Sequence, residues 1–147
     1  MYPYTNYHDA LNRPSNNLKS DVEKAINGEY SAIHCYGKLA NLAPSGDERK
    51  RILEIRKDEI RHFQLFEQIY TSLTGSQPQP KIIEECPDVY FDGVEFALQD
   101  EQKTVDFYME IADDATNQHI KEVFRRAAAD EQNHAVWFLY FFTKART

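Results

Sequence analysis

Apolar residues recur every three or four positions along most of the chain, which is the spacing of one face of an α-helix. The first run of this kind covers 22–43 and the second covers 52–73. Ser45 and Glu48 stand three residues apart ahead of the second run, in the pattern of a helix-capping box. The pattern therefore predicts two amphipathic helices, separated by a turn at Pro44-Ser45-Gly46.

The second half of the chain shows the same arrangement. A third helix is predicted from a cap near Asp92, with Glu95 as its capping-box partner, to Ala115. A fourth helix, with apolar residues from Ile120 to Phe141, follows the short polar turn at 116–118. We thus expect an all-α protein made of two helical hairpins.

Two segments lack this periodicity. Residues 1–17 are polar and rich in tyrosine, and we expect them to form an extended N-terminal arm. Residues 74–91 contain three prolines and Gly75, which ends the preceding helix, so this segment is predicted to be a crossover linker. The length of 147 residues suffices for one domain, which we place at 18–147.

The two hairpins are copies of one repeat, because an offset of 72 residues aligns them without a gap. The identical pairs are Val22/Val94, Glu23/Glu95, Ala25/Ala97, Glu29/Glu101, Tyr36/Tyr108, Ala40/Ala112, Ala43/Ala115, Asp58/Asp130, Glu59/Glu131, His62/His134 and Phe66/Phe138. Shared helical patterning explains the apolar pairs, whereas the charged pairs need another cause.

Six polar residues of the repeat lie on the apolar stripes of the four helices, where burial is expected. They are Glu29, Glu59, His62, Glu101, Glu131 and His134. The two glutamates of each hairpin that flank its turn lie about 15 residues from that turn, so all six side chains converge near mid-height of a bundle. Four ionised carboxylates there need neutralisation, because an unpaired buried charge costs several kcal/mol.

Two divalent cations would neutralise the four carboxylates, and no Lys or Arg lies on the stripes near that level. In each Glu-x-x-His pair the two side chains face the same side of the helix and can reach one ion. Carboxylate oxygen with imidazole nitrogen suits iron or manganese, and zinc less decisively. The alternative is a degenerate bundle that keeps these residues as a hydrogen-bonded polar core.

Four segments carry these motifs: AINGEYSAIHCY (25–36), KDEIRH (57–62), LQDEQKTVDFY (98–108) and ADEQNH (129–134). In them the sequence resembles the ferritin-like superfamily of di-iron carboxylate proteins, and most of all the helical domain of rubrerythrins. The resemblance implies an up-down four-helix bundle of two hairpins, joined by a long crossover, that binds two iron ions. It also implies two sets of ligands with Glu59 and Glu131 as bridges and catalytic residues. These sets are Glu29, Glu59 and His62 for one iron and Glu101, Glu131 and His134 for the other.

The sequence departs from the rubrerythrin pattern at two points. Rubrerythrins carry an extra metal-binding glutamate on the third helix, but the corresponding flanking positions here are Leu98 and Thr104. The four cysteines of a rubredoxin-type domain are also absent from the chain. Electrons are therefore expected from a separate donor, such as a rubredoxin-like or flavin protein.

Four further residues are predicted to lie next to the ligands. Asp58 and Asp130 precede the two bridging glutamates and could orient the histidine of the opposite hairpin, because a metal-bound imidazole needs an acceptor for its other nitrogen. A solvated position on the helix flank is the alternative for both. Tyr36 and Tyr108 could hydrogen-bond a ligand carboxylate or act as catalytic redox groups, or they could be core tyrosines bonded elsewhere.

Composition and charge narrow the function classes. The formal net charge of -7 argues against a nucleic-acid partner. The densest apolar run, 135–142, is too short to span a membrane, and no secretory signal is visible, so a cytoplasmic location is expected. Cys35 and Cys86 lack the C-x-x-C spacing of metal or redox sites and are expected to be two reduced thiols.

These features together predict a non-haem di-iron oxidoreductase that reduces peroxide or dioxygen under oxidative stress and forms a homodimer. Three alternatives use the same fold. They are a manganese catalase-like enzyme, a protein of iron oxidation followed by storage or delivery, and an inert metal-bound bundle.

Overall fold

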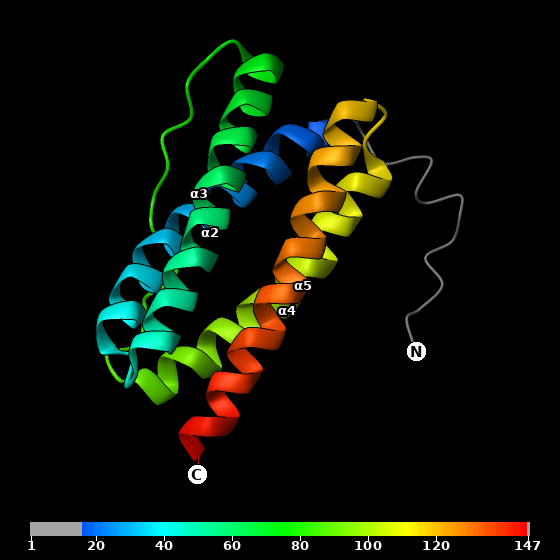
Figure 1. Cartoon of the computed structure of the whole chain (residues 1–147). Helices are drawn as coiled ribbons and strands as arrows, with labels where there is room; N and C mark the ends of the chain where they lie inside the picture. The colour runs from blue at the N-terminus through cyan, green and yellow to red at the C-terminus, as the bar shows by residue number, and fades with distance from the viewer. Residues whose placement is uncertain (1–15, 147) are drawn as a thin grey trace.

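The computed structural model describes residues 16–146, which form four helices and no strand. The helices are α2 (Asn16–Leu42), α3 (Gly46–Thr74), α4 (Tyr90–Asp114) and α5 (Gln118–Arg146). Figure 1 shows two antiparallel hairpins, α2 with α3 and α4 with α5, joined by the long crossover 75–89. None of these helices has a stretch long and apolar enough to cross a membrane. The predicted all-α bundle of two hairpins is confirmed.

Both ends of α3 are the predicted ones. The Ser45 hydroxyl oxygen accepts the backbone N–H of Glu48 at 3.2 Å, and the same hydroxyl donates to the Glu48 carboxylate at 3.2 Å. Gly75 follows the helix with a φ of 74°, a left-handed conformation that favours glycine. Its N–H donates to the Thr71 carbonyl at 2.8 Å, which satisfies one of the last carbonyls of the helix.

The predicted start of α4 is wrong. The helix begins at Tyr90, and the residue before it, Val89, gives no side-chain cap. Asp92 lies inside the first turn, where a carboxylate interacts favourably with the helix dipole, and Glu95 is not its capping partner. The Gly93 N–H already donates to the Val89 carbonyl at 2.9 Å, so the backbone closes this turn without a side chain.

Two smaller differences concern α2 and α3. The first helix begins at Asn16, so the last two residues of the predicted arm are helical, and residues 1–15 lie outside the described part of the chain. Leu73 was predicted on the buried stripe of α3 but is 42% exposed. It lies one turn beyond Ile69, which is the last buried residue of α3.

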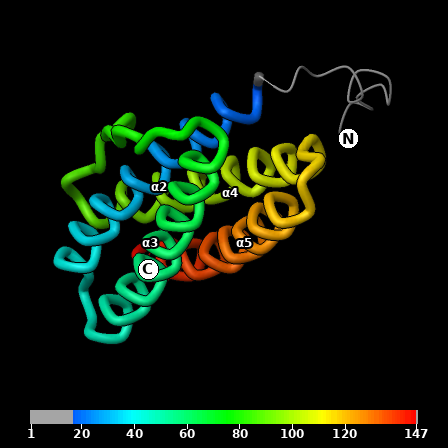
Figure 2. The backbone as a smooth tube through the Cα atoms, turned by 90° about the horizontal axis from the view of Figure 1, so that it is seen from above, coloured from blue at the N-terminus to red at the C-terminus, as the bar shows by residue number. Residues whose placement is uncertain are grey.

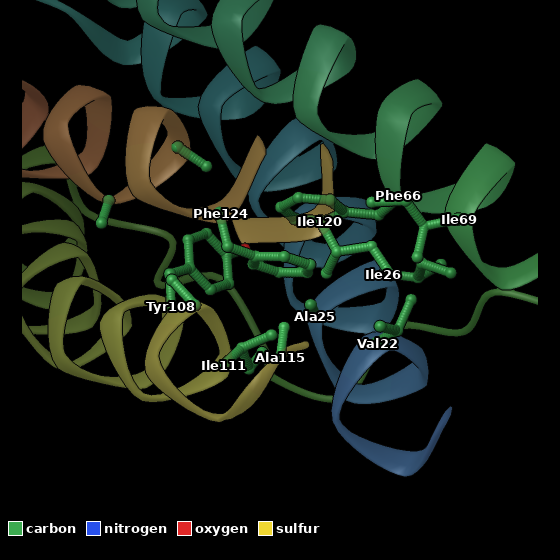
Figure 3. Close-up of a cluster of buried hydrophobic side chains, with 13 residues drawn as sticks. Val22, Ala25, Ile26, Phe66, Ile69, Tyr108, Ile111, Ala115, Ile120 and Phe124 are labelled. Atoms are coloured by element: carbon green, nitrogen blue, oxygen red, sulfur yellow. The ribbon is translucent and has the colours of Figure 1, made fainter. Parts of the chain in front are cut away.

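The apolar core consists of two clusters on either side of a polar layer. The first cluster contains Phe66, Tyr108 and Phe124 (Figure 3), and the rings of Phe66 and Phe124 stack with centroids 4.4 Å apart. The second contains Leu39 and Phe138. Because burial of large apolar side chains contributes about 1.5–3 kcal/mol each, these clusters fix the four helices around the layer between them.

The hairpins approach each other closely at Gly93 of α4. A Cβ atom at this position would lie 2.2 Å from Leu39 Cδ2, and Leu39 is fully buried, so the core would have to shift. We expect Gly93→Ala to lower the free energy of unfolding by about 1–3 kcal/mol, measured by chemical denaturation. Gly28→Ala is the matched control, since no atom lies within 4 Å of its added Cβ and alanine favours the helix. Equal stability of the two variants would contradict this packing.

The crossover folds back along α2, as Figure 2 shows. Its Cys86 forms a disulfide with Cys35 of α2, with the Cα atoms 5.2 Å apart. The prediction of two reduced thiols is therefore wrong. The two cysteines are 51 residues apart in the sequence, and only the path of the crossover brings them together.

Candidate metal centre

Six buried polar side chains meet between the two apolar clusters. They are Glu29 of α2, Glu59 and His62 of α3, Glu101 of α4, and Glu131 and His134 of α5, each at most 2% exposed. They form two groups, in each of which one donor atom per residue lies within 4.8 Å of the others. Glu59 and Glu131 belong to both groups, which is the placement that bridging ligands require. The structure thus brings all six sequence-predicted residues together.

One polar atom of each of these residues is buried without a hydrogen-bond partner. These atoms are Glu29 Oε2, Glu59 Oε1, His62 Nδ1, Glu101 Oε2, Glu131 Oε1 and His134 Nδ1. Some of them are close together, such as His62 Nδ1 and Glu131 Oε1 at 3.0 Å, but they lack the alignment of a hydrogen bond. A buried polar atom left without a partner costs about 1–3 kcal/mol. Four oxygens and two nitrogens that share a layer fit two ions of iron or manganese.

Each histidine is oriented from the opposite hairpin. His62 Nε2 lies 2.9 Å from Asp130, and His134 Nε2 lies 2.8 Å from Asp58, so both rings turn Nδ1 towards the centre. Arg61 lies within salt-bridge distance of both aspartates, at 3.3 Å from Asp58 and 3.2 Å from Asp130. The two aspartates therefore take the orienting position rather than the solvated alternative.

Removal of one orienting aspartate is expected to weaken metal binding. We expect Asp130→Ala to lower the affinity for a divalent ion by about 10–100-fold, because the His62 ring loses the acceptor that fixes it. Asp106→Ala is the control, since Asp106 is exposed on α4. Titration of the chelator-treated protein with Co²⁺ measures both affinities. An affinity equal to that of the control would remove the orienting role of Asp130.

The two tyrosines complete a symmetric set of contacts across the hairpins. The Tyr36 hydroxyl donates to Glu101 Oε1 at 2.5 Å, and the Tyr108 hydroxyl donates to Glu29 Oε1. In both glutamates the other oxygen, Oε2, is the one without a partner. Burial, followed by the charge of these carboxylates, raises the pKa of both tyrosines well above the usual range, so the hydroxyls stay protonated as donors.

The carboxylates do not titrate alike. Burial and then the charge of Glu59 raise the pKa of Glu29, and burial and then the charge of Glu101 raise the pKa of Glu131. Burial also opposes ionisation of Glu59, but close contacts with the two positively charged histidines outweigh burial and lower the Glu59 pKa. In the absence of cations, protons therefore partly neutralise the layer.

The histidines hold protons for the same reason. Although burial disfavours an imidazolium, the hydrogen bond with Asp130 and the nearby carboxylates of Glu29 and Glu59 raise the pKa of His62 to about 12. The nearby carboxylates of Glu101 and Glu59 likewise raise the pKa of His134 to about 11. Since a metal ion binds the neutral imidazole, occupation of the centre must displace these protons.

A cavity of about 220 Å³ reaches this layer from the side of α2, α4 and the crossover. Its inner wall includes Glu29, Glu59 and Glu131, and Glu84 of the crossover lies in its outer wall. Thr104 also lines the cavity. It is one of the two positions that correspond to the extra glutamate of rubrerythrins, and here it contributes a hydroxyl instead of a carboxylate. A small molecule thus has a path to the carboxylates.

The second half of the chain is related to a known protein family. The family model described as rubrerythrin matches residues 92–147 of this chain. The second hairpin, α4 with α5, thus matches the rubrerythrin family. It is 57% identical over 124 residues to the uncharacterized protein YhjR of Bacillus subtilis (strain 168), an alignment that covers 84% of this chain and 86% of the relative.

Two solved structures are similar to this chain in fold. A hypothetical protein from Pyrococcus furiosus has a TM-score of 0.73 at 19% identity, covering 86% of this chain and 88% of that chain. A conserved hypothetical protein from Mycobacterium tuberculosis has a TM-score of 0.76 at 13% identity, covering 88% and 94%. At these identities the likeness concerns the fold alone.

The rubrerythrin match covers α4 and α5, whereas the repeat extends the same chemistry to α2 and α3. Two features escaped the sequence prediction. Arg61, which lies between the orienting aspartates, has no identical repeat partner, because Asn133 occupies the corresponding position. The disulfide is the second such feature, because the spacing of Cys35 and Cys86 in the sequence matches no known cysteine motif.

Proposed function

We propose that the protein binds two iron ions and works as a non-haem oxidoreductase that reduces peroxide or dioxygen. A separate donor, such as a rubredoxin-like or flavin protein, would supply the electrons. One observation carries this proposal. Six ligand atoms without partners lie in one buried layer, and a cavity lined by three of the six residues connects that layer to the surface.

The residues of the chain would divide the work as follows. Glu59 and Glu131 would bridge the two ions, since both groups of donors include them. The orienting aspartates fix the imidazoles, and the tyrosine hydroxyls direct one carboxylate oxygen of Glu29 and of Glu101 inwards. The apolar clusters above and below the layer keep bulk water away from it.

Bound iron would supply the two electrons that reduction of one peroxide molecule requires. The six ligand residues need no rearrangement to bind the ions, because each already has one polar atom without a hydrogen-bond partner in the shared layer. The cavity volume suits a molecule as small as peroxide or dioxygen. The centre therefore combines a rigid set of ligands with restricted access.

Elemental analysis of protein purified without a histidine tag tests the metal. We expect about two irons per chain. After anaerobic reduction, one equivalent of peroxide should reoxidise the centre rapidly, as followed by near-ultraviolet absorbance. Iron that does not respond to peroxide would contradict the proposed reaction, and two manganese ions would favour the catalase-like alternative. Iron uptake beyond two per chain by a large assembly would favour storage.

A further inference from the structure

The crossover is attached to one face of α2. The Lys81 backbone N–H donates to Asn27 Oδ1 and the Ile83 N–H donates to Ser31 Oγ, both at 3.0 Å. Asn27, Ser31 and Cys35 follow one another at intervals of four residues, which places them on the same side of the helix. The disulfide to Cys35 is thus the third attachment in one row.

The same segment forms part of the wall of the cavity. Ile83 and Glu84 line it from the crossover, together with Asp100 and Lys103 of α4. Ile83 lies between the Ser31 attachment and the disulfide, only three residues before Cys86. The position of this short stretch therefore determines how widely the cavity opens.

Apart from the disulfide, polar contacts at the surface hold the end of this stretch, among them Lys38 Nζ, which donates to the Cys86 carbonyl at 3.4 Å. Ile82 and Ile83 are 53% and 46% exposed, so their burial contributes little to attachment. Lys38 pairs with Asp88, whose side chain is 91% exposed, and such surface pairs stabilise weakly. The segment forms no helix or strand of its own.

The two cysteines differ in exposure. Cys35 is 4% exposed on α2, whereas Cys86 is partly exposed on the crossover. An external thiolate therefore reaches Cys86 Sγ more readily than Cys35 Sγ.

We propose that Cys35–Cys86 is a thiol–disulfide exchange site that controls access to the carboxylate cavity. A protein or small-molecule dithiol would attack Cys86 Sγ, and the Cys35–Cys86 bond would break as a mixed disulfide forms. The second thiol of the reductant then resolves the mixed disulfide. The reductant is oxidised to its own disulfide, while Cys35 and Cys86 each gain one electron and one proton. The freed crossover moves away from α2 and widens the cavity; this role in metal access rests on the proposed function.

Hydrogen exchange tests the release of the crossover without any metal. The amides of Lys81 and Ile83 are protected in the oxidised protein by their bonds to α2. We expect reduction to raise their exchange rates by about tenfold or more, with the amides of α5 unchanged. Equal rates in the two redox states would overturn the proposal.

Loading of chelator-treated protein with Co²⁺ tests access. The reductant is removed under anaerobic conditions before cobalt is added. We expect the reduced protein to load about tenfold faster than the oxidised protein, with the same final stoichiometry. The variant Cys35→Ser/Cys86→Ser should load at the fast rate with or without prior reductant, which excludes an effect of the reductant on cobalt.

The outcomes separate the two proposals. Equal loading rates of oxidised and reduced wild-type protein would overturn control of access, even where cobalt binds fully. Failure of cobalt to bind in both states would instead contradict the metal centre, and the exchange rates of Lys81 and Ile83 would still decide whether reduction releases the crossover.

Discussion

Protein in which Glu59 and Glu131 are both replaced by alanine is expected to bind neither metal ion. Both residues belong to both groups of donors, so their removal leaves each ion with one glutamate and one histidine. Two ligands do not make the set of four to six that holds iron or manganese in a protein. Elemental analysis should find close to no metal per chain, against about two for the unaltered protein.

Two companion variants separate this loss from unfolding. Glu59→Gln/Glu131→Gln keeps side-chain volume and removes only the charge, and its helix content should match that of the unaltered protein by circular dichroism. Glu23→Ala/Glu122→Ala removes two exposed glutamates and should keep full metal content. Undiminished metal in the Glu59 and Glu131 variants would show that the ions lie elsewhere.

The fold could be predicted largely from periodicity. The stripes of apolar residues on each helix correspond to buried positions such as Val22, Ile52, Val94 and Phe124. Helix ends were predicted where a side chain or a glycine closes the turn, as at Ser45. The start of α4 was not, because its first turn is closed by backbone alone and leaves no side-chain signature.

The position of the candidate site could be predicted because charged residues lie on the apolar faces of the helices. The internal repeat strengthened this prediction, since the same residues recur in both hairpins. The sequence did not predict contacts between segments that are far apart in the chain and unrelated by the repeat. Arg61 and the disulfide depend on how α5 and the crossover lie against the first hairpin. A spacing rule describes one helix at a time, so such cross-hairpin contacts need coordinates.

Metal binding is expected to depend strongly on pH, because the layer of ligands holds protons when no metal is bound. In metal-free protein the raised pKa values of His62 and His134, about 12 and about 11, keep both imidazoles protonated near neutral pH. Each ion that binds Nδ1 must displace one of these protons, and Glu29 and Glu131 can release more. We expect the apparent affinity for the pair of ions to rise by about a hundredfold or more for each pH unit between 6 and 8.

Calorimetry in buffers with different ionisation enthalpies measures the protons released. About two to four protons per pair of Co²⁺ ions are expected. The variant Glu23→Ala/Glu122→Ala should release the same number. Binding that is independent of pH would mean that the imidazoles are neutral before the ions arrive.

The same pKa values set how stability depends on pH. A histidine with a raised pKa stabilises the folded state fully below its unfolded value, about 6.5, and this contribution is lost as pH rises towards 11 or 12. The raised pKa values of Glu29 and Glu131 act in the same direction. Chelator-treated protein should therefore lose stability as pH rises from 6 to 9. Loaded protein should not, because cations neutralise the carboxylates in place of protons, so the difference in Tm between the two forms should widen with pH.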